Sequence, residues 1–328
     1  MNVFLFPGQG SQHVGMGADL FKSDSVFRDL VALASELVGE DLESTCLRGP
    51  EKKLVQTRLL QPLLVAVSLG YLRHLNERGV QPDLALGHSL GEITALAAAG
   101  VVTPADAVRI AAKRAVLMDH AAARMDGAML AVTLEDKSRL LEWLASAQFE
   151  NGVVIANDNA PTQVVLSGER SAITTCAEFI AIEELGKCRF LSVSGPWHSP
   201  FMAEAASRFG EWLEQIPMLP HRVPMLFNHT AAHAKTAGDI RALISNALAK
   251  PVNWVGCMAA MRAMNPRYLY EVGPGGVLSG LARVNGFGET TQILRVGNLR
   301  GVELAVQTYF IASTESCPVH PPLLRYTS

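Results

Sequence analysis

Short apolar runs alternate with longer amphipathic stretches from the start of the chain. The runs predict strands at residues 3–6 and 84–86, and apolar positions at helical spacing predict helices at residues 25–38, 59–75 and 104–124. Strands that alternate with helices in this way are typical of an α/β fold with a parallel sheet.

The rhythm of the chain changes after Gly127. The pattern there predicts, in order, a strand at 128–134, a helix at 135–146, strands at 153–157 and 163–167, a helix at 171–185 and a strand at 188–193. This βαββαβ order is typical of a ferredoxin-like unit. We therefore expect a small ferredoxin-like domain over residues 127–195, inserted into a large α/β-hydrolase-like domain made of residues 1–126 and 196–300. The active site is expected in the cleft between them.

The last stretch, residues 301–328, is expected to be a C-terminal extension. Residues 302–311 have the pattern of a closing helix, whereas the prolines of residues 316–328 argue against regular structure there. No apolar run is long enough to span a bilayer, and the N-terminus lacks the basic segment of a signal peptide. We therefore expect neither export nor a membrane anchor.

Composition narrows the class of protein. The 328 residues are 49% hydrophobic and 18% charged, which suits a globular enzyme with a large core. A formal net charge of -3 offers no broad basic surface for nucleic acid or membranes. Five cysteines are scattered without metal-ligand spacing: Cys46, Cys176, Cys188, Cys257 and Cys317. They predict neither a disulfide framework nor a zinc site, so we expect a cytoplasmic protein. Separately, we expect a monomer.

A candidate nucleophile lies between a predicted strand and a predicted helix. The segment Gly87–Gly91 reads GHSLG, follows the apolar residues 84–86 and opens an alanine-rich helix at residues 92–99. A serine at such a sharp turn needs small flanking residues and presents its hydroxyl beside a helix N-terminus. The GxSxG spacing alone is common, so the strand-turn-helix context makes Ser89 the candidate.

A serine hydroxyl needs a base that titrates near neutrality, and His198 is the candidate among nine histidines. It lies in the segment that joins the proposed small domain back to the large one, where it can reach the cleft. A histidine beside Trp197 is equally consistent with a packed structural residue. His88, which precedes the nucleophile, can instead support the turn.

An acyl oxyanion is usually held by backbone N–H groups at a turn or helix start. The turn places the Leu90 N–H for this role, and the glycine-rich segment Phe6–Gln12 can bring a second donor. That segment is also consistent with an ordinary βα loop. Because no GK[ST] or GxGxxG motif follows it, nucleotide binding is not expected.

Together these motifs carry a specific resemblance. They occur in one order, as Phe6–Gln12, Gly87–Glu92, Asn159–Pro161 with Gln163–Val165, and Trp197–Pro200. The chain resembles the malonyl-CoA:acyl-carrier-protein transacylase family of fatty-acid and polyketide synthesis over residues 3–295. The resemblance implies that Ser89 takes malonyl from coenzyme A and passes it to the phosphopantetheine thiol of an acyl carrier protein, with His198 as the base in both halves. It implies that Gln9 and Leu90 form the oxyanion site.

The same resemblance gives a role to Arg114, which matches the family's arginine after the helix that follows the serine turn. Taken alone, Arg114 reads as one more charge on a solvated helix face. As the family's arginine it would bind a free carboxylate through two hydrogen bonds, which makes dicarboxylic acyl-CoA the leading substrate class. Trp197 and His88 are expected beside it in the substrate site.

Three positions depart from the family pattern. Ala247, next to Asn246, replaces a glutamine whose backbone carbonyl orients the histidine in relatives; alanine keeps that carbonyl, so the dyad is expected to survive. Trp197 is bulkier than the phenylalanine of malonyl-selective relatives and bears on the α-substituent, while Leu90 favours unsubstituted malonyl. Gly276 replaces a basic or small polar residue, a change that would alter carrier docking.

Other functions stay open at this point. A related hydrolase that clears acyl groups from carrier proteins uses the same turn and histidine, but generally lacks the arginine. A transferase for an unusual acyl unit between carriers, or a noncatalytic scaffold, are further alternatives. No metal or bound organic cofactor is expected, because coenzyme A arrives with the substrate and phosphopantetheine with the carrier protein.

Overall fold

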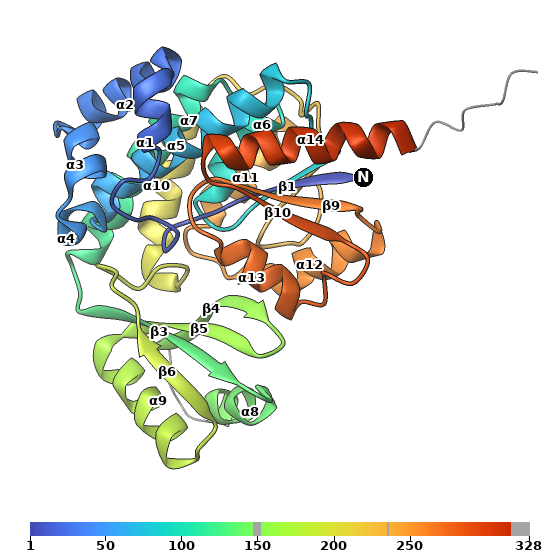
Figure 1. Cartoon of the computed structure of the whole chain (residues 1–328). Helices are drawn as coiled ribbons and strands as arrows, with labels where there is room; N and C mark the ends of the chain where they lie inside the picture. The colour runs from blue at the N-terminus through green and yellow to red at the C-terminus, as the bar shows by residue number, and fades with distance from the viewer. Residues whose placement is uncertain (147–151, 235, 316–328) are drawn as a thin grey trace, which may run out of the picture.

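A computed structural model describes residues 1–146, 152–234 and 236–315, and two five-stranded sheets organise this part of the chain (Figure 1). The larger body holds a parallel sheet in the order β10-β9-β1-β2-β7. Its strands are β1 (Asn2–Phe6), β2 (Leu84–Gly87), β7 (Met225–Leu226), β9 (Tyr268–Val272) and β10 (Gln292–Val296).

Helices cover both faces of this sheet. They are α1 (Ala18–Ser23), α2 (Ser25–Val38), α3 (Leu42–Arg48), α4 (Glu51–Leu54), α5 (Thr57–Glu77), α6 (Gly91–Ala98), α7 (Pro104–Ala122), η1 (Pro200–Met202), α10 (Ala203–Leu213), α11 (Ala237–Asn246), α12 (Trp254–Ala263), α13 (Val277–Val284) and α14 (Leu299–Glu315). In β1, Phe4 and Phe6 join the core cluster that includes α2, α5 and α7, whereas Val3 and Leu5 pack with α12 and α13. This alternation explains the unbroken apolar run of the strand, since both of its faces are buried.

The second sheet has the order β6-β3-β5-β4-β8. Its own segment of the chain supplies β3 (Gly127–Leu134), α8 (Ser138–Ser146), β4 (Val153–Ala160), β5 (Gln163–Glu169), α9 (Arg170–Ile182) and β6 (Gly186–Phe190). The βαββαβ order with antiparallel neighbours confirms the ferredoxin-like prediction. Leu130 and Val132 pack with the two helices, which lie together on one side of this sheet in Figure 1, and Met129 and Ala131 point to the opposite side.

One strand of the second sheet comes from elsewhere in the chain. The two residues of β8 (Val252–Asn253) pair in parallel with Asn157 and Asp158 of β4. The pattern of hydrophobic positions gave no sign of this pairing, because two residues carry no period. The division of the chain at residues 127 and 195 into two domains stays a prediction.

Most predicted elements are present, with shifted ends. The helix predicted at residues 135–146 starts at Ser138, whose N–H is capped by the Asp136 carboxylate. The last predicted strand ends at Phe190, after which Leu191 donates its N–H to the Met129 carbonyl. The closing helix α14 is longer than predicted, and residues 316–328 lie outside the described part.

Among the described residues, no helix combines the length and the apolar character needed to cross a membrane.

Candidate active site

Ser89 lies in a turn between β2 and α6 that only glycines can flank, and we call this turn, residues 87–91, the elbow. Its backbone is left-handed, with φ of 50°. A Cβ added to Gly87 would lie 1.9 Å from the Gly91 carbonyl carbon, and one added to Gly91 would lie 2.0 Å from the Phe6 carbonyl oxygen. The two glycines are therefore required by the close approach of β1, β2 and α6, which confirms the strand-turn-helix context.

The His198 ring faces the Ser89 hydroxyl. The Nε2 atom lies 2.7 Å from Ser89 Oγ, and the Nδ1 atom lies 2.8 Å from the Ala247 carbonyl and 3.1 Å from the Lys250 carbonyl. Since both neighbours of Nδ1 are acceptors, Nδ1 carries the proton and Nε2 is left to accept one. His198 is buried, but its contact with Ser89 favours the base over the alternative of a merely packed ring.

Burial, together with the smaller effect of the nearby positive charge of Arg114, lowers the pKa of His198 to about 3. The imidazole is therefore neutral at pH 7. A neutral imidazole with a free Nε2 lone pair is the form that can take a proton from a hydroxyl.

Arg114 is a buried cation beside the nucleophile. It lies on α7 with 3% of its surface exposed, and its Nη2 donates to Ser89 Oγ at 3.1 Å. Within the described residues, no carboxylate lies within 4.0 Å of its guanidinium. Burial lowers the pKa of Arg114 to about 10, with the Glu92 charge opposing the shift, so the group stays positive at pH 7. Arg114 is not on a solvated face, and it can bind an incoming carboxylate.

The glycine-rich segment after β1 packs directly on the elbow. A Cβ on Gly8 would lie 2.5 Å from the His88 carbonyl oxygen, so the loop approaches as closely as glycine allows. In the residues that the structure describes, the N–H groups of Gln9 and Leu90 have no acceptor. The Gln9 side chain contacts Thr57 Oγ1 at 3.4 Å. Two unpaired N–H groups on either side of a nucleophile are suited to hold an oxyanion.

The His88 side chain contacts other residues of the protein, Asn159 and Trp254. Its Nε2 lies 2.8 Å from Asn159 Oδ1 on β4, and its ring lies edge-on to Trp254 at 5.1 Å between centroids. Burial lowers the pKa of His88, so the ring is neutral. These contacts match the elbow-supporting role more closely than the substrate-binding one, although His88 does line the cavity.

The remaining predicted residues differ in their distance from the reacting atoms. Trp197 is buried and lines the same cavity as Ser89. Ala247 supplies the carbonyl expected to orient His198. Asn246 does not, because its side chain is exposed and its carbonyl accepts from the Ala249 N–H. The Lys250 carbonyl is a second orienting group that the sequence did not reveal.

Two further residues at the elbow were missed by sequence reasoning. Asn228 Oδ1 accepts from the Ser89 N–H at 2.6 Å, and its Nδ2 donates to the Gly87 carbonyl at 2.6 Å. Glu92 Oε1 accepts from the Asn228 N–H at 2.7 Å. Burial raises the pKa of Glu92 to about 8. The one available signal was a carboxylate in the first turn of an otherwise apolar helix, Glu92 in α6.

These groups open into a cavity of about 550 Å³ between the two sheets. The parallel-sheet body contributes Gln9, Ser89 and Arg114, and the second sheet contributes Met129, Asn157 and other residues of β3–β6. Its size and the few convergent polar groups are typical of a small-molecule site.

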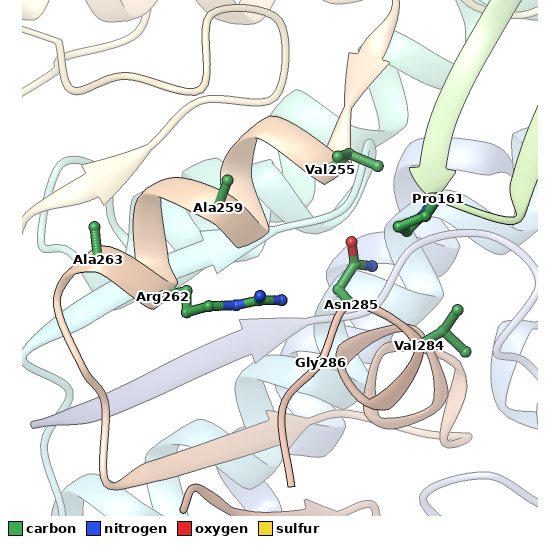
Figure 2. Close-up of a pocket in the computed structure, with 8 residues that line it drawn as sticks. All are labelled: Pro161, Val255, Ala259, Arg262, Ala263, Val284, Asn285 and Gly286. Carbon is green, nitrogen blue, oxygen red and sulfur yellow. The ribbon is translucent and has the colours of Figure 1, made fainter. Parts of the chain in front are cut away.

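A second cavity, of about 680 Å³, lies at the junction of α12, α13 and the turn after β4 (Figure 2). Arg262 extends from α12 toward Gly286, and its guanidinium lies 5.4 Å from the Phe287 ring centroid. The other lining side chains are neutral: Pro161, Val255, Ala259, Ala263, Val284 and Asn285. With no nucleophile or base in its lining, this cavity is not the candidate site despite its larger volume.

Comparison with known proteins agrees with the geometry. The acyl transferase domain family matches residues 3–283. A malonyl CoA-acyl carrier protein transacylase of Bacillus subtilis is 34% identical over 308 residues, which are 93% of this chain and 96% of the relative. A polyketide biosynthesis malonyl CoA-acyl carrier protein transacylase of the same species, PksC, is 33% identical over 86% of this chain and 96% of its own.

Solved structures give the same result. A complex described as a type II PKS acyl-carrier protein with its malonyl-transacylase superposes with a TM-score of 0.88 at 31% identity, over 94% of this chain and 99% of that one. Both the sequence match and the shared fold extend over nearly the whole chain. On these grounds, the chain belongs to the acyl transferase domain family.

Proposed function

We propose that this protein transfers a malonyl group from coenzyme A to the phosphopantetheine thiol of an acyl carrier protein. The observation that carries the proposal is the buried, carboxylate-free guanidinium of Arg114, 3.1 Å from the Ser89 hydroxyl. A fixed cation at that place binds the carboxylate of a malonyl group, whereas an acetyl group has no carboxylate to pair with it.

The acylation step follows from the contacts at the elbow. His198 Nε2 takes the proton of Ser89 Oγ as the oxygen attacks the thioester carbonyl, and a C–O bond forms. The N–H groups of Gln9 and Leu90 receive the negative oxygen. The intermediate then collapses, the C–S bond breaks, and His198 returns its proton to the departing coenzyme A thiolate. The product is malonyl-Ser89.

The second half runs in reverse with a different thiol. His198 takes the proton of the phosphopantetheine thiol, the sulfur attacks the malonyl ester, and Ser89 Oγ leaves with the proton that His198 gives back. During both halves the Arg114 guanidinium holds the malonate carboxylate. Because the nucleophile, base, oxyanion donors and carboxylate site all belong to this chain, no resident cofactor is part of the proposal.

The setting of the reaction is also part of the proposal. Relatives named for polyketide biosynthesis and relatives without that label are almost equally similar to this chain, so the proposal covers fatty-acid and polyketide synthesis alike. The solved complex with an acyl-carrier protein supports a carrier protein as the acceptor. We place the protein in the cytoplasm, where the four described free cysteines would remain reduced.

Intact-mass measurement after brief incubation with malonyl-CoA tests the proposal, with acetyl-CoA and methylmalonyl-CoA in parallel. The expected result is a malonyl adduct that is absent from Ser89→Ala and moves to a carrier protein added afterwards. Clearance of acylated carriers to free acid, with no adduct from malonyl-CoA, would replace the transferase by the hydrolase. A strong preference for methylmalonyl-CoA would assign the space beside Trp197 to an α-substituent.

A further inference from the structure

The left-handed backbone of Ser89 has a dedicated support. A non-glycine residue with positive φ is strained, so the surrounding structure must hold it there. The Gly87 carbonyl lies at the end of β2 and the Ser89 N–H lies within the turn. Both are bound by one side chain, the Asn228 amide, at 2.6 Å each.

We propose that Asn228 is a positioning residue that holds the Ser89 hydroxyl in its reactive place, through two hydrogen bonds to the backbone of the elbow. An amide is the side chain that fits, because it presents one acceptor to the Ser89 N–H and one donor to the Gly87 carbonyl. Asn228 touches neither the hydroxyl nor the cavity, so its effect passes through the backbone alone.

Asn228 is itself held from both sides. Its N–H donates to the buried Glu92 carboxyl group at the start of α6, and its carbonyl accepts from the N–H of Asn253. Asn253 belongs to β8, the strand that completes the second sheet. The elbow is thereby tied to the junction of the two sheets, and Asn228 is 1% exposed.

The substitution Asn228→Asp separates this role from simple packing. When protonated, the aspartic acid can accept from the Ser89 N–H and donate to the Gly87 carbonyl, as asparagine does. When ionised, it keeps the first bond but turns a lone pair toward the Gly87 carbonyl oxygen. The elbow should therefore be restored at low pH and disturbed at high pH.

The readout is the rate of Ser89 labelling by a small fluorophosphonate, followed by intact mass from pH 5 to pH 8 and divided by the wild-type rate at each pH. The ratio removes the pH dependence of the reagent and of His198, whose pKa of about 3 lies below this range. Glu92 contacts residue 228 and would titrate together with the new carboxyl group, so the same ratio is also measured in a Glu92→Gln background. We expect the Asn228→Asp ratio to fall roughly 10- to 100-fold as pH rises, and Asn228→Ala to be slow by a similar factor at every pH.

The matched control is Asn298→Asp, whose side-chain oxygen accepts from the Gly301 N–H in the first turn of α14 and takes no part in the contacts of the elbow. Its ratio should not change with pH. Labelling of Asn228→Ala within about threefold of wild type would overturn the proposal. If Asn228→Asp unfolds at high pH, Asn228→Ala still decides.

The inference rests on the proposed function only in taking Ser89 as the nucleophile. The fluorophosphonate needs no acyl donor, so the labelling test stands even if malonyl transfer by the wild-type protein is not found. Loss of malonyl transfer with normal labelling of the wild type would remove the proposed function and leave the role of Asn228 intact.

Discussion

At the scale of single residues, the site is built from strained backbone and buried charge. Ser89 and His198 both have positive φ, at 50° and 58°, and each is held by backbone-directed hydrogen bonds. Arg114 and Glu92 are ionisable groups removed from water. Each of these features costs stability, and their concentration around one hydroxyl is typical of a functional site.

The first prediction concerns the selectivity that Arg114 gives. Replacing Arg114 by alanine removes the partner of the acyl carboxylate, so the rate of Ser89 acylation by malonyl-CoA should fall by roughly 100-fold or more, in line with the loss of a buried charged pair. Acylation by acetyl-CoA, which has no carboxylate, should change less than tenfold. Pre-steady-state mass measurement gives both rates.

Arg114→Lys is the matched variant, because it keeps the charge but not the two-pronged geometry. Its selectivity should fall between those of wild type and Arg114→Ala. Equal loss of malonyl and acetyl acylation in Arg114→Ala would show that the residue serves Ser89 alone and does not select the substrate.

The second prediction concerns stability and pH. The folded-state pKa of Glu92 is raised to about 8 from an ordinary 4.5, so unfolding releases a proton between these values and the protein loses stability as pH rises from 4.5 to 8. Glu92→Gln should therefore melt progressively higher than wild type as pH increases over this window, with no further gain above pH 8. A melting-temperature difference that is constant from pH 5 to pH 8 would contradict the assignment.

His198 acts in the opposite direction. Its folded-state pKa is lowered to about 3 from 6.5, so unfolding takes up a proton between these values, and stability falls as pH drops through that window. Glu92→Gln retains this acid-side loss, which serves as an internal control in the same set of melting curves.

Sequence reasoning reached the residues that carry chemistry but not those that hold them. Ser89 and His198 were found from motifs, and Arg114 and Ala247 from positions of the family. Asn228 was missed because it acts across 139 positions of sequence, from a turn with no pattern of its own. Contacts between distant backbone segments leave no mark on hydrophobic spacing.

At the scale of elements, the elbow depends on how closely β1, β2 and α6 approach. The third prediction compares two glycines in helices. Gly91→Ala places a Cβ 2.0 Å from the Phe6 carbonyl oxygen and should destabilise the protein by about 3 kcal/mol or more, or prevent folding. Gly280→Ala in α13 meets nothing within 4 Å and should stabilise by about 0.5–1 kcal/mol.

Urea unfolding of the two variants beside wild type measures both effects. If Gly91→Ala lost less than about 1 kcal/mol of unfolding free energy, the packing of α6 on β1 would have to be looser than described. Gly280→Ala is the control, because it shows whether replacing a helical glycine by alanine destabilises this protein in general.

Long elements were predictable and short ones were not. The helix predicted at residues 25–38 has those same ends in α2, because a 14-residue amphipathic pattern is capped by Asp24 and Gly39. The two-residue strands β7 and β8 were absent from the prediction. They form because neighbouring strands already exist, which makes them consequences of the tertiary fold.

At the scale of the whole molecule, the candidate site lies where the two sheets meet. The parallel-sheet body supplies the nucleophile, base and cation, and the second sheet closes the cavity over them. The hydrogen bond from His88 to Asn159 and the pairing of β8 with β4 join the two at the elbow. The fold class and the βαββαβ order could be predicted from the sequence, but these two contacts between the sheets could not.

The fourth prediction concerns whether residues 127–195, when isolated from the rest of the chain, form a folded monomer. In the intact chain β8 covers the outer edge of β4, and residues 127–195 do not include it. The isolated segment should therefore self-associate in size-exclusion chromatography at micromolar concentration, through the uncovered backbone of β4. Adding a peptide of residues 249–255 should reduce the association, and a scrambled peptide should not. A folded monomer without the peptide would count against this expectation.

The pairing of β8 with β4, from a distant part of the chain, also affects how such a protein can change over evolutionary time. A segment whose sheet is finished by a distant stretch of chain cannot be exchanged as a cassette between homologues, because a swap at residues 127 and 195 would set a foreign β4 against the native β8. Hybrid enzymes exchanged at residues 127 and 195 should have β4 and β8 strands that do not match. Hybrids that exchange residues 250–254 as well should keep the native pairing of these two strands.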